Sequence, residues 1–375
     1  MKIWVDENIP LAETLFGQLG DVVPFAGRTL GHGDVQEADA LVVRSVTQVN
    51  ASLLAGSRVK FVGTATIGVD HLDLPWLAQQ GITVCSAPGS NAQSVAEYVL
   101  SALAALGTTL EDLLAGGCVG IVGFGNVGRQ VARCLAALGI AYRAYDPWMP
   151  DDLDPNLTDL DAVTASQVLC CHAPLVKDGA HPSYHLLGVE DLTRLDTGGV
   201  LLNAGRGGVL DTEALLSLKQ QRPDIALVMD VWENEPAIDL SLAQQCAIAT
   251  PHIAGYSLDG KIRGAVMIAR ALAQQLGASL DEAVFSQSSA EVKVPASGEG
   301  AHFIRSLIHS VYDVREDDQR FRHILTGDVA AGFDRLRKDY PVRRELAACD
   351  FDFPGGLSEQ QRDLLLALTT PTANL

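Results

Sequence analysis

Three side chains suited to proton transfer and anion binding follow one another in the second half of the chain. Arg206 stands in "LLNAGRGG", Glu235 in "VMDVWENEP" and His252 in "IATPHIAG", and each comes after a short apolar run. A histidine can take a proton from a substrate hydroxyl and return it in the reverse direction, because its pKa lies near neutrality. A carboxylate orients such an imidazole and stabilises its protonated form. An arginine offers a planar fork to a carboxylate or keto oxygen.

Each of these residues also has a structural interpretation when it is taken alone. A histidine at a strand end is often a satisfied structural residue, a glutamate in "ENEP" is often a solvated turn carboxylate, and an arginine in a glycine-rich turn need not bind a ligand. Their order behind a dinucleotide-binding motif favours the catalytic interpretation, because the carboxyl ends of neighbouring parallel strands meet at one edge of a sheet.

That motif lies in "VGIVGFGNVGRQVARCLAALG", where Gly123, Gly125 and Gly128 follow an apolar strand and begin a helix that stops at Gly139. The first glycine allows a tight turn, the second lets a pyrophosphate approach the backbone, and the third packs helix on strand. The pyrophosphate then lies at the helix N-terminus. Asp146 ends the next predicted strand, 18 residues after Gly128. A carboxylate there bonds a ribose and repels a 2′-phosphate, which favours NAD over NADP. The alternative is a glycine turn with Asp146 as an ordinary strand-end cap.

These residues need a framework of parallel strands, and the first 280 or so residues predict one. Short apolar runs alternate there with helical patterns, which is typical of parallel sheets covered on both faces. Ten strands are too many for one mononucleotide unit, so we expect an α/β chain with two doubly wound, Rossmann-like domains. The ten runs are "KIWV", "ALVVRS", "VKFVGTA", "ITVCSA", "VGIVG", "AYRAYD", "VLCCHA", "GVLLNA", "IALVMDV" and "CAIATPH".

Two further segments bear on domain organisation. "SNAQSVAEYVLSALAAL" predicts an amphipathic helix with Ser90 or Asn91 as its N-cap, joining one α/β domain to the next. "SQSSAEVKVPASGEG", which begins at residue 286, is typical of a linker. Beyond it, apolar residues recur at helical spacing, so the last 90 or so residues predict a small separate module. These residues are Phe303, Ile304, Leu307, Ile308, Val311 and Tyr312.

Composition narrows the class of protein. The chain has 375 residues, 47% of them hydrophobic and 19% charged, which suits a globular enzyme of two or three domains and excludes a mainly disordered protein. Its formal net charge of −19 disfavours nucleic acid and anionic membranes as partners. An anionic small substrate would need a local pocket of arginine and lysine.

The same data predict a cytoplasmic protein without a metal centre. "MKIWVDENIP" lacks the apolar run of a signal peptide, and no stretch reaches the roughly 18 apolar residues of a membrane span. Seven cysteines are scattered without the spacing of a metal site or a disulfide framework, and Cys170 and Cys171 sit in a predicted strand. We therefore expect reduced thiols.

The motifs quoted above, taken in order with "NAGRGGVLD", "DVWENEP" and "PHIAG", resemble those of the D-isomer-specific 2-hydroxyacid dehydrogenases. A finer resemblance runs through nearly the whole chain, in "DALVVRSVTQVN", "FVGTATIGVDHLD", "SAPGSNAQSVAEYV", "PHIAGYSLDGKIRG", "VYDVREDD" and "YPVRREL". It points to the branch of the family that oxidises a phosphorylated 2-hydroxy acid with NAD in pyridoxine biosynthesis.

The resemblance also implies roles for individual residues. It makes Arg206, Glu235 and His252 catalytic, with His252 as the proton carrier. It places the substrate against Ser45, Thr66 and Tyr256. The implied NAD contacts come from the glycine loop and from the ends of later strands: Gly123, Gly125, Asn126, Val127, Gly128, Asp146, Ala173, Arg206, Gly207, Gly208, Asp230 and Gly255.

The family fold implies three domains. A substrate domain would comprise residues 1–95 and 256–285, an NAD domain residues 96–255, and a small C-terminal α+β dimerisation domain residues 286–375, so a homodimer is expected. Two positions depart from the family pattern. Ser90 stands where a cysteine is expected, and Ala173 stands where threonine is common, which removes one hydroxyl near the cofactor.

Without the resemblance, the substrate residues have alternatives. Ser45 and Thr66 each follow a predicted strand and would serve equally as strand-end caps, and Tyr256 has packing as its alternative role. The cations nearest in sequence that would hold a substrate phosphate are Arg44, Lys261 and Arg263.

Two rival functions also fit part of the pattern. The first is another dehydrogenase of the same chemistry, acting on 3-phosphoglycerate or an unphosphorylated D-2-hydroxy acid, in which Arg206, Glu235 and His252 would be unchanged. The second is an NAD(H)-sensing co-repressor, a class that retains the catalytic residues but binds peptides. Turnover of a small acid distinguishes the second from both enzymes.

Overall fold

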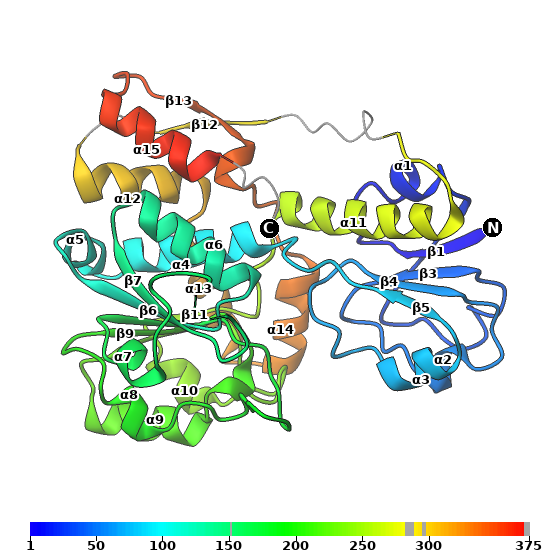
Figure 1. Cartoon of the computed structure of the whole chain (residues 1–375), viewed down its shortest axis with the longest axis horizontal. Coiled ribbons are helices and arrows are strands. Elements are labelled where there is room, and N and C mark those ends of the chain that lie inside the picture. The colour runs from blue at the N-terminus through cyan, green and yellow to red at the C-terminus, as the bar shows by residue number, and fades with distance from the viewer. Residues whose placement is uncertain (151, 282–288, 295–297, 371–375) are drawn as a thin grey trace. The chain divides into compact units, whose positions relative to one another are not determined.

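The computed structural model describes residues 1–150, 152–281, 289–294 and 298–370 (Figure 1). The chain divides into two compact units. The first unit comprises Met1–Asn91 and Ser257–Ser289, and the second comprises Ala92–Tyr256 and Ala290–Leu375. Each unit is built around one parallel sheet, which confirms the predicted α/β class with two doubly wound sheets.

The first unit has a five-stranded parallel sheet in the order β2-β1-β3-β4-β5. Apolar side chains alternate between its faces, so one face packs against α1 and α11 and the other against α2 and α3. The strands are β1 (Lys2–Asp6), β2 (Asp21–Phe25), β3 (Ala40–Val43), β4 (Phe61–Thr64) and β5 (Thr83–Cys85). The helices are α1 (Ala12–Phe16), α2 (Ala51–Leu54), α3 (Leu74–Gln79) and α11 (Leu258–Leu276).

Strand β2 is the one strand of this sheet that the sequence analysis did not predict. It contains Pro24 and begins with Asp21, both of which are rare in strands. Proline cannot donate a hydrogen bond to a neighbouring strand, and β2 lies at the edge of the sheet, where it pairs only with β1. The edge position therefore tolerates a sequence that a central strand would not.

The second unit has a six-stranded parallel sheet in the order β11-β10-β9-β8-β6-β7. The strand order reverses at β6, so the carboxyl edge beside β6 and β8 is the position where such sheets bind ligands. The strands are β6 (Cys118–Val122), β7 (Ala141–Tyr145), β8 (Val168–Cys171), β9 (Val200–Asn203), β10 (Ala226–Met229) and β11 (Ile248–Ala249). All ten predicted strands are thus present.

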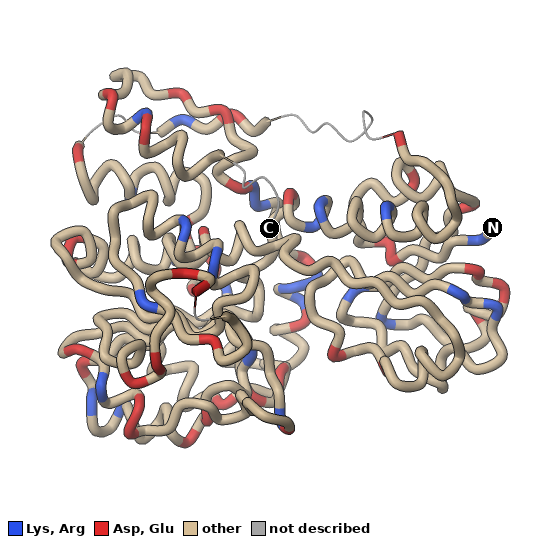
Figure 2. Tube along the Cα trace, in the orientation of Figure 1, with Lys and Arg blue, Asp and Glu red and all other residues tan. Residues whose placement is uncertain are grey.

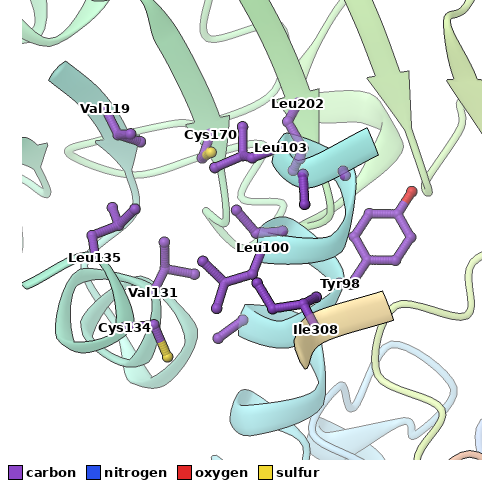
Figure 3. Close-up of a cluster of buried hydrophobic side chains, with 14 of the residues drawn as sticks. Tyr98, Leu100, Leu103, Val119, Val131, Cys134, Leu135, Cys170, Leu202 and Ile308 are labelled. Carbon is purple, nitrogen blue, oxygen red and sulfur yellow. The ribbon is translucent and has the colours of Figure 1, made fainter. Parts of the chain in front are cut away.

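Helices cover both faces of this sheet (Figure 1). On one face α4 and α6 pack against Val119 of β6, Cys170 of β8 and Leu202 of β9 (Figure 3). On the other face lie α7, α8, α9 and α10. Their bounds are α4 (Ala92–Ala105), α5 (Thr109–Leu114), α6 (Asn126–Ala137), α7 (Leu160–Thr164), α8 (Val189–Leu192), α9 (Thr212–Gln221) and α10 (Leu240–Gln245).

Helix α4 confirms a predicted helix but corrects its character. The spacing of its apolar residues predicts an amphipathic helix, whereas α4 is buried on nearly all sides, including the polar side chains of Ser94, Glu97 and Ser101. The sheet covers one side of it, and Ile308 of α12 packs on another (Figure 3). The C-terminal segment therefore removes the solvent-facing side that an isolated α/β domain would leave on this helix.

The C-terminal segment contains α12 (Gly300–Val311), α13 (Val314–Ile324), α14 (Val329–Lys338) and α15 (Glu359–Thr369), and α12 confirms the helix expected from apolar spacing. The predicted linker is partly wrong. Residues Ala290–Lys293 form a strand, β12, which pairs in parallel with β13 (Cys349–Asp352). The rest of the expected linker includes positions 286–288 and 295–297, which lie outside the described residues.

The distribution of charged residues and the hydropathy of the helices can also be read from the structure. Figure 2 shows acidic and basic residues interspersed along the chain in both units. Among the described helices, none combines the length and the apolar composition that crossing a bilayer requires.

Candidate active site

The candidate catalytic residues follow three neighbouring strands of the second unit. β9, β10 and β11 are adjacent and parallel, so their carboxyl ends lie at one edge of the sheet. Arg206 follows β9, Glu235 lies in the loop after β10, and His252 lies in the loop after β11. The three loops that carry these residues therefore lie at the same edge of the sheet.

Glu235 and His252 form a direct pair. His252 Nδ1 lies 2.7 Å from Glu235 Oε2, and Glu235 Oε1 accepts a hydrogen bond of 2.8 Å from the backbone N–H of Trp232. Burial alone would raise the pKa of Glu235, but the positive charge and hydrogen bond of His252 outweigh it and lower the pKa. The glutamate is therefore anionic at neutral pH and holds Nδ1, so that Nε2 is the ring nitrogen turned away from the carboxylate.

The backbone of His252 adopts a left-handed conformation, with φ of 58°. For a residue other than glycine such a conformation costs about 1–3 kcal/mol and needs support from its surroundings. The N–H of His252 donates to the Asp230 carbonyl at 2.7 Å. The Asp230 carboxylate accepts hydrogen bonds from Ile253 N (2.8 Å), Ala254 N (3.0 Å) and the Thr250 hydroxyl (2.6 Å). Asp230 therefore fixes the loop that carries His252.

These contacts bear on the role expected for Asp230. Its carboxylate is fully buried beneath the His252 loop, and burial raises its pKa in spite of the hydrogen bonds that it accepts. The observed role is support of the loop, while a contact with NAD stays a prediction. The sequence analysis did not foresee the support, because it depends on backbone N–H groups rather than on residue types.

The turn that carries Arg206 packs directly against the loop of Glu235. A side chain at Gly207 would collide with the backbone of Trp232 and Glu233, so only glycine fits this close approach. The indole N–H of Trp232 in turn donates to the Thr250 carbonyl at 2.9 Å. Trp232 thereby joins the loops after β9, β10 and β11, a function that the motif "DVWENEP" gave no means of predicting.

The glycine loop has the geometry of a dinucleotide cradle. Gly123, with φ of 92°, lies so close to Ala173 that a side chain would collide with its backbone, and a side chain at Gly128 would collide with the carbonyl of Gly123. A Cβ added to Gly125, by contrast, would meet no atom within 4 Å, so space remains above the loop. Helix α6 begins at Asn126, directly after Gly125, and the N–H groups of a first helical turn have no partner within the helix.

Asp146 follows β7 and is tied to this loop. Its carboxylate accepts hydrogen bonds from Phe124 N at 2.9 Å and Trp148 N at 3.0 Å. The side chain is partly exposed beside the glycine loop, as a ribose ligand requires. The glycine contacts, the open space at Gly125 and the placement of this carboxylate together fit a bound dinucleotide.

The remaining NAD candidates lie at the same edge of the sheet. Ala173 is buried between Gly123 and Gly205, at the end of β8. The carbonyl of Gly208 accepts a 2.9 Å hydrogen bond from His185 N. Val127 lies in the first turn of α6, and Gly255 lies in the turn closed by a 2.8 Å hydrogen bond from Tyr256 N to Ile253 O.

The structure places the other substrate candidates in the first unit. Ser45 is exposed just past β3, and Thr66 lies just past the neighbouring strand β4. The Thr66 hydroxyl is 2.7 Å from that of Thr64 and donates to the carbonyl of Gly68 at 3.2 Å. The two candidates therefore share the carboxyl edge of the five-stranded sheet.

Two of the three candidate phosphate ligands also lie at this edge. Arg44 pairs with Asp6 at 3.1 Å. Lys261, in the first turn of α11, has a pKa lowered to about 8 by its burial and by the nearby charge of Arg44. Arg263 instead donates to the carbonyl of Ser90 at 2.9 Å, which commits it to the local structure.

Two arginines from the C-terminal segment were missed by sequence reasoning. Arg337 of α14 donates to the Tyr256 hydroxyl at 3.2 Å, and Arg343 donates to the Ala254 carbonyl at 3.1 Å. Both therefore contact the loop that begins at His252. Arg343 lies in "YPVRREL", one of the segments that carry the resemblance, but that segment does not indicate its contact with a loop more than 80 residues away in sequence. Arg337 lies outside the quoted segments.

Solved structures of other proteins share this architecture. NAD⁺-bound 3-phosphoglycerate dehydrogenase of Entamoeba histolytica superposes with a TM-score of 0.63 at 23% identity, covering 75% of this chain and 97% of that one. D-lactate dehydrogenase of Aquifex aeolicus, solved with NAD and lactic acid, gives a TM-score of 0.60 at 24% identity over 73% of this chain and 96% of that one. These likenesses concern the fold.

Relatives match at much higher identity and over more of the chain. Erythronate-4-phosphate dehydrogenase of Teredinibacter turnerae is 48% identical over 92% of this chain and 94% of its own. The proteins of the same name from Cellvibrio japonicus and Tolumonas auensis are 47% and 43% identical, over 92% and 98% of this chain and 93% and 98% of their own.

Family models assign the two parts of the second unit separately. The NAD binding domain of the D-isomer specific 2-hydroxyacid dehydrogenases matches residues 93–254, and a domain of unknown function (DUF3410) matches residues 286–368. NAD is thus the cofactor of the domain that contains the glycine loop. The chain belongs to the D-isomer specific 2-hydroxyacid dehydrogenase family, and within it to the group of the erythronate-4-phosphate dehydrogenases.

Proposed function

We propose that the protein oxidises 4-phospho-D-erythronate to (R)-3-hydroxy-2-oxo-4-phosphobutanoate with NAD, a step of pyridoxal 5′-phosphate biosynthesis. The observation that carries the chemistry is the His252–Glu235 pair, 2.7 Å apart, at the carboxyl edge of an NAD-binding sheet. The substrate is taken from the name of the relatives that match over nearly the whole chain.

The proposed catalytic steps are supported by the His252–Glu235 contact and by the adjacent strands that carry the three residues. His252 Nε2 takes the proton of the substrate C2 hydroxyl, while Glu235 keeps the imidazole oriented and stabilises its positive charge. Arg206 binds the substrate carboxylate and the oxygen that becomes the ketone. Bound NAD supplies the acceptor for the hydride that leaves C2. In the reverse direction His252 returns the proton to the ketone oxygen.

Recognition of the anionic substrate rests on further residues. Tyr256 follows His252 by four positions and is proposed to bond a substrate oxygen, as are Ser45 and Thr66. Arg44 and Lys261 are proposed to hold the phosphate, because two cations near one another in a protein of net charge −19 form a local site for an anion. Burial and the nearby charge of Arg44 disfavour the protonated form of Lys261, and a bound phosphate would favour it.

The cofactor role of single residues is likewise proposed. Asp146 would bond the adenosine ribose, and the loop of Gly123, Gly125, Asn126, Val127 and Gly128 would bind the pyrophosphate. Ala173, the Arg206–Gly208 turn, Asp230 and Gly255 would line the remainder of the NAD site.

Assembly and location complete the proposal. We propose a substrate domain (1–95 and 256–285), an NAD domain (96–255) and a C-terminal domain (286–375) through which two copies form a homodimer. The separate family match at 286–368 supports only the bounds of the C-terminal domain. A cytoplasmic location is supported by cysteines that are all free thiols in the described structure.

The deciding experiment is turnover by purified protein of NAD with 4-phosphoerythronate, beside 3-phosphoglycerate and D-lactate, with products identified by mass spectrometry. A second set includes a 2-oxo acid as acceptor, in case reduced cofactor stays bound. Selective conversion of 4-phosphoerythronate is expected. Conversion of another acid would keep the mechanism and discard this substrate. Absence of turnover with NAD still bound would favour an NAD(H)-sensing protein.

A further inference from the structure

The side chain of Tyr256 is held by the C-terminal segment. Arg337 Nε of α14 donates to the Tyr256 hydroxyl at 3.2 Å, and the guanidinium carbon lies 5.8 Å from the centre of the tyrosine ring. Tyr340 packs edge-on against the same ring, with centroids 5.5 Å apart and an interplanar angle of 87°. All three residues belong to the second unit, so these contacts lie within one compact body.

In the contact between Arg337 and Tyr256, the arginine is the hydrogen-bond donor. A guanidinium donates hydrogen bonds and has no acceptor, so the Tyr256 oxygen is the acceptor in its bond with Arg337. The hydroxyl hydrogen of Tyr256 must then point to an acceptor other than Arg337. Tyr256 stands four residues after His252, in the loop whose backbone is also held by Asp230 and Arg343.

Arg337 also bears on the charge of the site. Burial disfavours its positive form, but the nearby Tyr256 and Glu235 outweigh burial and raise its pKa. In return Arg337 is one of the groups that lower the pKa of Glu235. The guanidinium also lies over the ring of Phe333, 5.9 Å from its centre. A partly buried cation thus stands beside both Tyr256 and the catalytic pair.

We propose that Arg337 is a positioning residue of the active site, which holds Tyr256 as a hydrogen-bond donor to an oxygen of the acid substrate and supplies positive charge beside it. The C-terminal domain would then serve catalysis as well as assembly. The inference rests on the proposed function only in that the site binds a 2-hydroxy acid. It holds for any such acid, because the donor and the charge would recognise any anionic oxygen at this position.

The test compares Arg337→Met with wild type and with Arg335→Met, a matched control on the exposed side of the same helix. We expect Arg337→Met to lower kcat/KM for 4-phosphoerythronate about 10- to 100-fold, mainly through KM, because a charged hydrogen-bonding group is lost. Arg337→Lys should recover part of the loss, since it keeps the charge but not the planar fork. Arg335→Met should match wild type.

Two readouts separate positioning from general stability. NADH affinity, from fluorescence titration, should be unchanged in Arg337→Met, because the glycine loop is not involved. In addition, Arg337→Met should cost less activity in a Tyr256→Phe background than in wild type, since the hydrogen bond between the two side chains is already absent and only the charge of Arg337 is lost. Additive losses, or a loss of NADH affinity that matches the loss of activity, would overturn the proposal.

A binding measurement that does not require turnover tests this inference separately from the proposed function. Oxalate, a planar dicarboxylate, is titrated calorimetrically into the NADH-loaded protein. Weaker oxalate binding by Arg337→Met, about 10-fold or more, supports the inference even if wild type fails to oxidise 4-phosphoerythronate, in which case only the proposed substrate falls. Equal oxalate affinity in wild type and Arg337→Met, or no oxalate binding by wild type, would overturn the inference.

Discussion

His252 Nδ1 lies 2.7 Å from Glu235 Oε2, although the two residues leave the ends of different strands, β11 and β10. The pair depends on the parallel pairing of these strands, on the hydrogen bond from Trp232 N to Glu235, and on the Asp230 carboxylate that holds the loop of His252. The arrangement fixes Nδ1 as the imidazole nitrogen that faces the carboxylate, which leaves Nε2 for the proposed proton transfer.

The pair predicts the behaviour of a histidine variant. His252→Ala should keep NADH affinity, because the glycine loop is untouched, and should lower kcat about 10²- to 10⁴-fold, the usual contribution of a general base. Steady-state kinetics beside a fluorescence titration with NADH would measure both. A rate close to that of wild type would rule out His252 as the proton carrier.

The lowered pKa of Lys261 predicts a pH dependence of substrate affinity. In the free protein Lys261 loses its proton around pH 8, whereas an unfolded chain keeps it to about pH 10.5. KM for 4-phosphoerythronate should therefore rise as the pH passes through about 8, because the phosphate loses a cation. Lys261→Met should raise KM below pH 8 and flatten this rise, and the exposed Lys60→Met should behave as wild type. An unchanged rise in Lys261→Met would assign it to another group.

The same shift has a consequence for stability, with a definite sign. The folded-state pKa of Lys261 is below the unfolded value, so between about pH 8 and pH 10.5 the unfolded chain binds the extra proton and stability rises with pH. Below pH 8 Lys261 carries its charge in both states, and burial of that charge lowers the free energy of unfolding by the full amount. Lys261→Met should therefore raise the Tm of the ligand-free protein at pH 7, as measured by calorimetry, and this gain should shrink towards pH 10. A lower Tm for this variant at pH 7 would contradict the burial argument.

Asp146 predicts cofactor preference. Asp146→Ala should weaken NAD binding and relax the exclusion of NADP, because both the ribose acceptor and the negative charge are lost. Since the carboxylate also accepts hydrogen bonds from Phe124 N and Trp148 N, Asp146→Asn is the better-matched variant, with one acceptor oxygen retained. The ratio of kcat/KM for NAD to that for NADP is the measurement. A ratio equal to that of wild type in both variants would remove Asp146 from the ribose role.

Most of the framework was predictable from the sequence, for a physical reason. Strands of a parallel sheet are buried on both faces, so their apolar runs are continuous and easily recognised, as in Val168–Cys171. The exception, β2, is an edge strand in which Pro24 is tolerated. Helix α4 was predicted with the wrong character because the C-terminal helix that covers it is more than 200 residues away in sequence from its first turn.

The candidate site also contains residues that were predictable from the sequence and residues that were not. Residues that follow strands, such as Glu235 and His252, were predictable because topology gathers the ends of parallel strands. The residues that hold these loops in place were not predictable. Trp232 acts through its backbone and indole N–H groups, and Arg337 reaches Tyr256 from a helix 81 positions later in the chain, so neither leaves a local pattern in the sequence.

Asp230 gives the last prediction. Its buried carboxylate accepts two backbone N–H bonds and one hydroxyl bond from the loop of His252, so Asp230→Asn would set an amide N–H against a backbone N–H donor. Leaving such a group unsatisfied costs about 1–3 kcal/mol, and the loop would no longer support the left-handed backbone of His252. We expect a lower Tm together with a lower kcat.

The matched control for this variant is Asp239→Asn, at an exposed helix cap that also accepts a backbone N–H. NADH affinity should fall in Asp230→Asn only if the carboxylate also contacts the cofactor, so the same titration tests that role. If Asp230→Asn unfolds at the temperature of wild type and keeps its kcat, then the carboxylate does not hold the loop. The position of His252 would in that case depend on the parallel pairing of β10 and β11 and on Glu235 alone.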